Sequence, residues 1–247
     1  MRSRGVSIEF VGVPGAGKST LAHALAELLR RRGASVSEPS YSLDHASGSR
    51  LRTLHKAEYV LASALRSPRT ALAALRLVRQ GGHTELRETW RLAANLVYNC
   101  EVSRRRLAKN QTRILDQGIV QAYWSIDFAG THPLERESAT RLLRAVLPIG
   151  SVVVILITAR EVVRSRLARR SEAASRLERR MRVGDAEATL ERAMAALARV
   201  EAMVADLARE RRISVIHVES VEAAGPASAA TALDASLAAM LQTRETR

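Results

Sequence analysis

The feature that constrains this chain most is a glycine-rich octapeptide close to its amino end. Residues 12–19 read Gly-Val-Pro-Gly-Ala-Gly-Lys-Ser, which matches the pattern G-x-x-x-x-G-K-S/T in full, and Thr20 follows. The largely β-branched run Val6–Val11 precedes the octapeptide, and a helical pattern from Lys18 to Arg32 follows it. A strand, a glycine turn and a helix in this order predict an α/β fold with the turn at the carboxyl end of a strand.

The residue types in this loop suit the binding of phosphate groups. Glycines leave room for backbone amides to turn inward around phosphate oxygens, and the following helix adds the positive end of its dipole. We expect Lys18 to neutralise the β- and γ-phosphates and the Ser19 hydroxyl to ligate Mg²⁺. ATP and Mg²⁺ are therefore the expected cofactors. The predicted cofactor-binding residues are Gly12, Pro14, Gly15, Ala16, Gly17, Lys18, Ser19 and Thr20.

Four further short apolar runs alternate with helical segments along the chain, at residues 34–37, 113–115, 151–158 and 213–218. Parallel strands need long crossover connections, so this alternation predicts a five-stranded, mainly parallel sheet. Helices would cover both of its faces, giving a three-layer α/β fold. Residues 152–157 are apolar throughout, as expected of a central strand.

The second and third predicted strands are separated by about seventy residues that read as helices, at 50–66, 68–80 and 84–109. We expect one domain over residues 1–247, with residues 41–110 inserted as a helical cap on the acceptor side. A further helix at residues 185–211 is expected to pack on its own domain, with a coiled coil as the alternative. A homodimer is left open.

The chain is strongly basic, with 39 Lys and Arg against 25 Asp and Glu and a net charge of +14. Such a charge can mark binding to nucleic acid or to an anionic membrane. However, three of the 39 are Lys, so the excess is Arg in an Ala-rich background, and phosphate-rich small substrates fit the same charge. We expect a small-molecule partner and no stable nucleic-acid partner. The stretch at residues 66–79 mixes Leu with Arg, which leaves peripheral membrane contact open.

A cytoplasmic location is the expectation from three observations. Cys100 is the one cysteine, so no internal disulfide can form, and the first ten residues lack the apolar stretch of a secretory signal. The longest uninterrupted apolar run is residues 152–157, far short of the ~20 residues that span a bilayer.

A second phosphate-handling element is expected at the end of a neighbouring strand. Asp116 stands where the apolar residues 114–115 meet the turn Gln117-Gly118. There a carboxylate can hold Mg²⁺ directly or through water, so Ser19 and Asp116 are the predicted metal ligands. A strand-ending Asp that caps the next helix is the alternative.

Together these motifs resemble the P-loop nucleoside and nucleotide kinases, and the nearest branch is that of thymidylate kinase and the deoxynucleoside kinases. The resemblance rests on residues 12–19, on Ser37-Glu38-Pro39 after the second strand, on Asp116-Gln117-Gly118, and on the Arg-rich residues after the fourth strand. It covers most of the sheet core and the lid, and it does not cover the long insert in detail. It implies phosphoryl transfer from ATP to a small molecule.

The resemblance assigns the acceptor side to Glu38. In deoxynucleoside kinases the corresponding Glu acts as a base toward a sugar hydroxyl, and a carboxylate in reach of an alcohol can take its proton. An exposed turn acid before proline is the other interpretation. Gln117 stands where the family has Arg, and Asn95 falls about where thymidylate kinases bind the acceptor phosphate with Arg. Both departures remove a cation from the expected acceptor side, which argues against dTMP as the substrate. Arg104, Arg105 and Arg106 either compensate for the missing cations or form a solvated helix face.

Residues 162–183 resemble the arginine-rich lid of this family. Guanidinium groups brought in by a closing lid would stabilise the charge that spreads over the transferred phosphoryl group. Arg166, Arg170 and Arg176 fall on the family's arginine positions, with a salt-bridged helix surface as the alternative. The predicted catalytic residues are Lys18, Glu38, Asp116, Arg170 and Arg176.

The expected activity is thus ATP- and Mg²⁺-dependent transfer to a nucleoside or nucleotide. Two alternatives remain: a kinase for a non-nucleotide alcohol, such as a sugar, a lipid-linked intermediate or a secondary metabolite, and an NTPase switch associated with nucleic acid. The aromatic residues that could stack on an acceptor base are more simply read as core: Tyr59, Trp90, Tyr98, Tyr123 and Trp124.

Overall fold

The fold was described from a computed structural model of the chain, which covers residues 5–39, 58–63, 65–83, 85–105, 107, 111–169, 175–219 and 225–245. Five strands form one sheet in the order β2-β3-β1-β4-β5, and each neighbouring pair of these strands is parallel. The predicted α/β class with a parallel five-stranded sheet is therefore confirmed. The strands are β1 (Val6–Val11), β2 (Ser35–Ser37), β3 (Gln111–Leu115), β4 (Val152–Ile157) and β5 (Ser214–Glu219).

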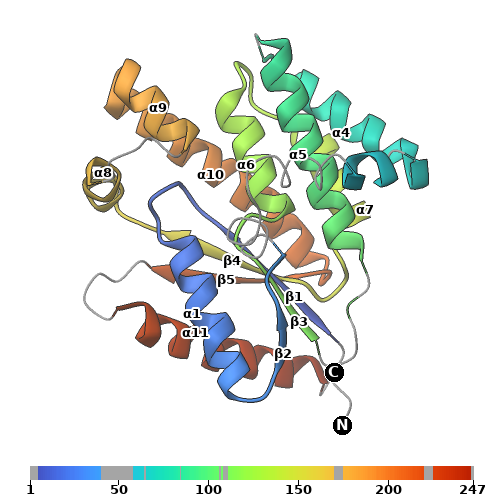
Figure 1. Ribbon diagram of the computed structural model, residues 1–247, viewed down its shortest axis with the longest axis vertical. Coiled ribbons are helices and arrows are strands. Elements are labelled where there is room, and N and C mark those ends of the chain that lie inside the picture. Colours follow the sequence, from blue (N-terminus) through green and yellow to red (C-terminus); the bar gives the residue numbers. More distant parts are fainter. Residues whose placement is uncertain are drawn as a thin grey trace.

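Helices cover both faces of the sheet (Figure 1). On one face, α1 (Lys18–Arg31) packs against α11 (Gly225–Glu245). On the other face, α6 (Ile119–Ala129) packs on β1 and α10 (Ala186–Arg209) packs on β5. Outside these two helices lie α4 (Pro68–Gln80), α5 (Leu86–Arg104) and α7 (Arg136–Val146). The helix predicted at residues 185–211 is α10, and it packs on its own domain as expected.

Strand β4 is buried on both faces, as its all-apolar sequence predicts. Val152 to Leu156 are at most 2 % exposed, because β4 lies between β1 and β5 and is covered by helices from both faces. Ile157, at the carboxyl end of the strand, is 45 % exposed.

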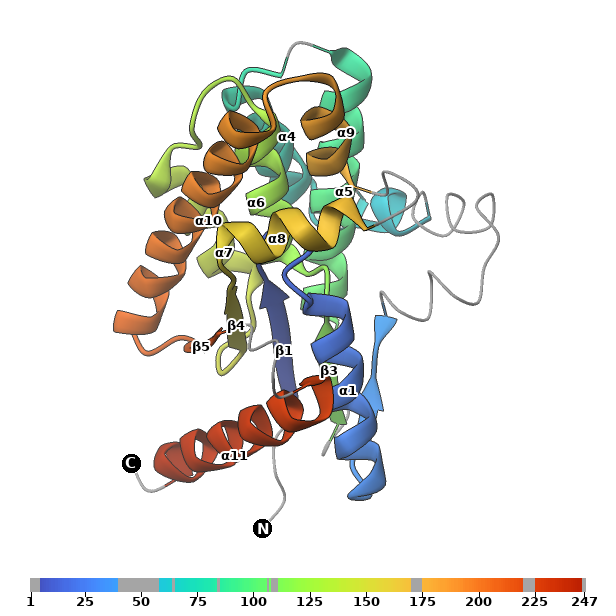
Figure 2. The ribbon, with the colours of Figure 1, turned by 90° about the vertical axis from the view of Figure 1, so that its left-hand side faces the viewer.

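The carboxyl ends of the strands share one edge of the sheet, which is the upper edge in Figure 2. Helix α8 (Arg160–Ala168) crosses above the end of β1, and α9 (Arg176–Val183) lies farther out and packs against α10. Helices α4 and α5 of the insert also stand beyond this edge. Of the helix predicted at residues 50–66, the part at 50–57 lies outside the described residues, whereas residues 58–63 are helical.

Helix α5 ends at Arg104, earlier than the predicted end at residue 109. The reason is a side chain from the neighbouring strand. The Arg113 guanidinium of β3 donates to the carbonyl oxygens of Val102 at 2.7 Å and Arg105 at 2.9 Å, where a continuing helix would place backbone amides. Arg113 thus caps the carboxyl end of α5.

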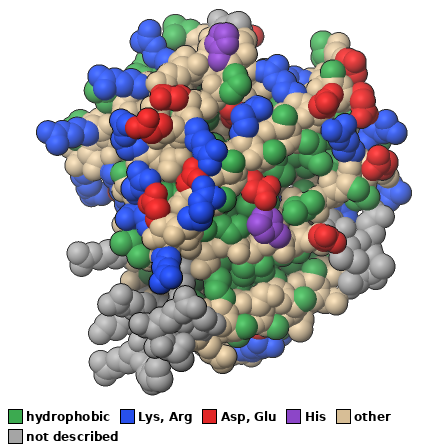
Figure 3. All heavy atoms as spheres, turned by 180° about the vertical axis from the view of Figure 1, so that it is seen from behind, with side chains coloured by type: hydrophobic (Ala, Val, Ile, Leu, Met, Phe, Trp, Pro, Cys, Tyr) green, Lys and Arg blue, Asp and Glu red, His purple; other side chains and the backbone are tan. Residues whose placement is uncertain are grey.

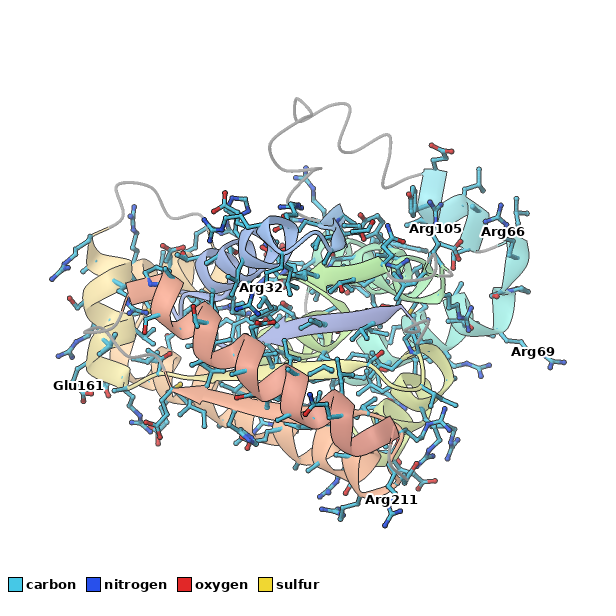
Figure 4. The ribbon with its side chains drawn as sticks, turned by 90° about the horizontal axis from the view of Figure 1, so that it is seen from below. Arg32, Arg66, Arg69, Arg105, Glu161 and Arg211 are labelled. Atoms are coloured by element: carbon cyan, nitrogen blue, oxygen red, sulfur yellow. The ribbon has the colours of Figure 1, made fainter. Side chains whose placement is uncertain are left out.

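The arginines are spread over the molecule. On the back face Lys and Arg side chains are interspersed with Asp and Glu (Figure 3). Arg66 and Arg69 of the insert and Glu161 of α8 lie at opposite ends of the molecule (Figure 4). On α4, Leu77 and Val78 are buried and Leu72 is 47 % exposed, so part of the apolar side of residues 66–79 packs inward. No helix among the described residues has the length and apolar character needed to span a bilayer.

Candidate active site

The glycine-rich loop wraps around the carboxyl end of β1 and leads into α1. Gly15 and Gly17 have φ angles of 86° and 97°, in the left-handed region that side chains with a Cβ rarely adopt. No side chain caps the first turn of α1, and that turn contains no acid. Its amide groups are therefore available to an anion in front of the loop.

Two side chains hold the loop in shape. The Lys18 ammonium folds back and donates to the carbonyl oxygens of Gly12 at 2.8 Å and Val13 at 3.0 Å. The backbone amide of Gly12 donates to Gln121 Oε1 at 3.1 Å, which ties the start of the loop to the first turn of α6. Gln121 is 7 % exposed, and no pattern in the sequence pointed to it.

Ser19 and Asp116, the two predicted metal ligands, lie side by side. The Ser19 hydroxyl donates to Asp116 Oδ2 at 2.8 Å, although 97 positions separate the two residues in the chain. They meet because β1 and β3 are neighbours, so the turns that follow them share the same edge.

The oxygen atoms at this point fit a bound Mg²⁺. Asp116 Oδ1 is buried and has no hydrogen-bond partner among the described residues, which is a costly state for a carboxylate oxygen unless a ligand completes it. A hydroxyl and a carboxylate are the hard oxygen ligands that Mg²⁺ takes. The described residues contain no cluster of three or more His, Cys, Asp or Glu that could hold a metal without other ligands. A metal here would thus share its coordination with phosphate and water, as Mg²⁺ commonly does.

One arginine of the lid segment reaches the loop. Arg166 Nη1 of α8 donates to the carbonyl oxygens of Gly15 at 3.2 Å and Ala16 at 3.3 Å. A Cβ atom on Gly17 would lie 3.6 Å from the same nitrogen, so the guanidinium rests directly against the loop. Arg166 therefore joins the lid segment to the backbone of the glycine-rich loop.

The other predicted lid arginines are placed differently. Arg170 lies outside the described residues. Arg176 pairs through Nε with Glu88 Oε1 of α5 at 2.8 Å, and its Nη1 donates to the Ser125 carbonyl oxygen of α6 at 3.4 Å. Burial lowers the pKa of its guanidinium, although Glu88 opposes this shift. In this conformation Arg176 joins α9 to α5 and α6; its predicted catalytic role stays a prediction.

Glu38 lies at the end of β2 and faces α1. Its carboxylate is 6 % exposed and accepts Arg30 Nη2 at 2.6 Å through Oε2, while Oε1 lies 3.4 Å from His23 Nδ1. The interpretation of Glu38 as an exposed turn acid is therefore wrong. The role of Glu38 toward the acceptor is not tested by these contacts.

The arginines expected on the acceptor side contact other residues of the protein. Arg104 donates to Thr70 Oγ1 at 2.6 Å, and Arg105 donates to the Tyr59 hydroxyl at 2.6 Å while lying 3.9 Å from its ring centre. Arg106 is outside the described residues. Arg104 is half-buried, which does not fit the alternative of a solvated helix face, whereas Arg105 is exposed and still fits it. The core interpretation of the aromatic residues holds for Tyr98, Tyr123 and Trp124, which are at most 5 % exposed, whereas Trp90 is 58 % exposed.

Glu9, in the middle of β1, was not predicted as a functional residue. It is 1 % exposed, and its carboxylate accepts the Val120 backbone amide at 3.1 Å and the Ser103 hydroxyl at 3.3 Å. Burial raises the pKa of this carboxyl to about 7, against the lowering effect of these hydrogen bonds and of Arg113. The signal was present in the sequence: a charged residue at the centre of an otherwise apolar strand is rare unless it is paired.

Comparison with known proteins gave structural likeness alone. No family model matches the chain, and no curated protein matches it by sequence. Among solved structures, EHV4-TK, a herpesvirus thymidine kinase, in its complexes with TP5A and TP4A, aligns over 94 % and 95 % of this chain and 90 % of the other. The identity is 14 % in both cases and the TM-scores are 0.44 and 0.43. At TM-scores below 0.5 these alignments carry no argument about activity, so any assignment of activity depends on the geometry of the site.

Proposed function

We propose that this protein is an ATP- and Mg²⁺-dependent phosphotransferase that acts on the hydroxyl group of a small molecule, with nucleosides as the first acceptors to test. The observation that carries the proposal is the contact between Ser19 and Asp116, with the buried Oδ1 atom of Asp116 left without a partner among the described residues. A phosphate-binding turn next to a strand-ending acid is what Mg²⁺-nucleotide chemistry requires.

Each residue then has a physical task. The amides of Gly15 and of residues 17–19 would surround the β-phosphate, while the Ala16 amide donates to the Val13 carbonyl oxygen at 3.1 Å. Lys18 would exchange the carbonyl oxygens of Gly12 and Val13 for phosphate oxygens. Bound Mg²⁺ would neutralise charge on the β- and γ-phosphates. Ser19 and Asp116 would orient that ion from the protein side. The chemistry depends on positioning and charge, and no covalent enzyme intermediate is needed.

Arg166 is the described lid arginine best placed to stabilise the transferred group. It already rests on the loop through the carbonyl oxygens of Gly15 and Ala16, so a short rotation of its side chain would bring the guanidinium in front of the loop. Arg170 and Arg176 remain candidates for the same task, with Arg176 requiring release from Glu88.

The acceptor side favours a neutral alcohol over a phosphorylated one. Gln117 and Asn95 carry no charge, and Arg104 and Arg105 are engaged by Thr70 and Tyr59. A nucleoside therefore fits better than a nucleoside monophosphate. The same observation supports the second candidate, a kinase for a non-nucleotide alcohol, because nothing in the described acceptor side selects a base over another ring.

Titration calorimetry with ATP, with and without Mg²⁺, tests the proposal directly. We expect binding in the micromolar range that tightens by about tenfold or more when Mg²⁺ is present, because Ser19 and Asp116 contribute to the metal's coordination. In Asp116→Asn the hydrogen bond with Ser19 can persist but the charge is lost, so the Mg²⁺-dependent gain should disappear. No ATP or GTP binding under either condition would refute the proposal.

A transfer assay identifies the acceptor class. Labelled ATP is incubated with nucleosides, nucleoside monophosphates and sugars, and the expected products are phosphorylated nucleosides or other alcohols. Glu38→Gln should lower turnover with the true acceptor if Glu38 takes its proton; unchanged turnover would remove Glu38 from that role. Hydrolysis of ATP without transfer to any acceptor would favour the switch-type NTPase instead.

A further inference from the structure

The carboxylate of Glu9 lies where the strand that leads into the glycine-rich loop meets the first turn of α6. It accepts the Val120 amide at 3.1 Å, and the Ile119 amide also bonds to it. Gly118, between Asp116 and α6, has no side chain because a Cβ atom there would lie 2.5 Å from the Glu9 carboxyl carbon. The chain therefore wraps closely around this one carboxylate as it leaves β3.

The turn that Glu9 holds supports both halves of the site. On its amino side, two residues before Gly118, stands Asp116, which receives the Ser19 hydroxyl. On its carboxyl side, one residue after Val120, stands Gln121, which accepts the Gly12 amide at the start of the loop. A displacement of this turn would move Asp116 and the loop's anchor together.

We propose that Glu9 is a positioning residue that sets the spacing between Asp116 and the glycine-rich loop by holding the first turn of α6, and that it makes this spacing sensitive to pH. This inference rests on the proposed nucleotide site for its functional consequence. The geometric part of the inference, that Glu9 holds the first turn of α6, does not depend on a bound nucleotide.

Helix electrostatics explain why ionisation matters. The amides in the first turn of α6 have no carbonyl partner within the helix and carry partial positive charge, and an ionised carboxylate attracts them more strongly than a protonated one. Since burial raises the Glu9 pKa to about 7, the residue changes charge close to neutral pH. Protonation weakens the contact with the Val120 amide and loosens the turn.

The groups around Glu9 do not titrate in the same range. From β3 it faces Arg113, which stays cationic although burial lowers its pKa. From α5 it faces Ser103 and Cys100; burial raises the pKa of the Cys100 thiol to about 12, so the thiol stays neutral. Cys100 in turn senses Arg104 and Glu101 of α5, and Glu101 pairs with Arg66. From β4 the residue paired with Glu9 is Val153, and α6 meets Glu9 through backbone amides.

Two variants separate positioning from simple stabilisation. Glu9→Gln keeps the size of the side chain and an oxygen that can accept the Val120 amide, but it has no charge at any pH. Ser103→Ala removes the side-chain hydrogen bond of the same carboxylate and leaves its backbone contacts with α6 in place. Ser103→Ala is therefore the matched control.

Hydrogen exchange tests the geometric part without nucleotide. We expect the amides of Ile119 and Val120 to exchange about tenfold faster at pH 6 than at pH 8, after correction for intrinsic rates, in the wild-type protein. In Glu9→Gln that difference should vanish and exchange should be fast at both pH values, whereas Ser103→Ala should keep it. Protection in Glu9→Gln equal to that of the wild type would overturn the proposal.

Calorimetry tests the functional part. The gain in ATP affinity on adding Mg²⁺ should rise about tenfold from pH 6 to pH 8 in the wild type and in Ser103→Ala, and should stay flat in Glu9→Gln. If this gain depended on pH equally in all three proteins, Glu9 would not control the spacing between Asp116 and the glycine-rich loop. If the wild type bound no ATP, the proposed function would fail, while hydrogen exchange would still decide whether Glu9 controls the turn.

Discussion

The two ends of helix α6 are held in opposite ways. At its amino end, amides meet one buried carboxylate, Glu9, and the adjoining residues carry the candidate site. At its carboxyl end, Arg180 donates to the carbonyl oxygens of Phe128 and Ala129, both at 3.0 Å, and Arg192 donates to that of Gly130. Both arrangements follow the helix dipole, which favours anions at the amino end and cations at the carboxyl end.

The difference between the ends lies in what can titrate. Guanidinium groups keep their charge at every physiological pH, so the carboxyl end of α6 is a permanent attachment for α9 and α10. Glu9 has a pKa of about 7, so the amino end changes with pH. The arginine contacts at the carboxyl end of α6 are therefore expected to be independent of pH, whereas the Glu9 contact at its amino end is expected to change with pH. Variants at the two ends should therefore separate loss of function at one end from loss of stability at the other.

The largest effect is expected from Lys18→Ala, at the amino end. Removing the ammonium should weaken ATP binding by at least about 100-fold, because hydrogen bonds from a cation to phosphate are among the strongest in proteins. The unfolding midpoint should change little, since Lys18 is half-buried at the surface of the loop. Calorimetry gives the affinity, and Arg31→Ala, an exposed position on the same helix, is the control. Unchanged ATP affinity in Lys18→Ala would refute the assignment of the loop.

The pH dependence of stability should report on Glu9. The Glu9 pKa is raised from 4.5 to about 7 in the folded protein, so the folded state holds the proton more tightly than the unfolded state. Its contribution to stability is complete below pH 4.5 and is lost as the pH rises through 7, a fall of up to about 3 kcal/mol. Protonation removes a buried charge and so stabilises the whole fold, even though the local contact with α6 weakens.

Urea unfolding at a series of pH values measures this contribution. Glu9→Gln should flatten the stability profile between pH 4.5 and 7, because the amide carries no proton that titrates in this range. Equal profiles in the variant and the wild type would show that Glu9 does not titrate there.

Arg180→Ala tests the carboxyl end of α6. Losing two charge-assisted hydrogen bonds to helix carbonyls should lower the free energy of unfolding by about 2 kcal/mol. The loss should be independent of pH between about 5 and 8, because no titratable carboxylate accepts from Arg180 in these bonds. Denaturant unfolding at both pH values provides the comparison. A loss that follows the Glu9 titration would mean that the two ends are not independent.

The smallest and most discriminating effect concerns Arg166 and Arg176, two of the three arginines that resemble the family's lid positions. Arg166→Ala should lower turnover at saturating ATP about tenfold, because Arg166 rests on the loop. Arg176→Ala should mainly reduce stability if Arg176 keeps its pairing with Glu88 during turnover. Steady-state kinetics together with thermal unfolding distinguish the two. Equal losses of turnover in the two variants would support the predicted catalytic role of Arg176. Unchanged turnover in both variants would show that these lid arginines take no part in phosphoryl transfer.

Local sequence determined much of the fold. All five strands were predicted to within two residues at each end, because apolar runs bounded by turns leave few alternatives in an α/β chain. The glycine-rich loop fixed the start of α1 at Lys18, and the hydrophobic spacing located α10. The pairing of Ser19 with Asp116 also followed from residue type and position, since both stand at the carboxyl ends of parallel strands.

Other features depend on contacts between residues far apart in the chain, and no local pattern contains them. The strand order β2-β3-β1-β4-β5 decides which turns meet, and it arises from the crossover connections. The capping of α5 by Arg113, the anchoring of the loop by Gln121 and the assignment of Arg166 and Arg176 to different neighbours were set by packing. In a chain with this much arginine, spacing cannot say which guanidinium faces the loop.

The sequence by itself determined that strands and helices alternate, that a glycine-rich turn follows β1 and that an acid follows β3. The tertiary structure decided the environment of each charged group: Glu9 became a buried carboxylate with a raised pKa, and Glu38 an ion-paired one. The physical reason is that desolvation and charge pairing depend on everything packed around a side chain, whereas helix and strand periodicity depends on its neighbours in sequence.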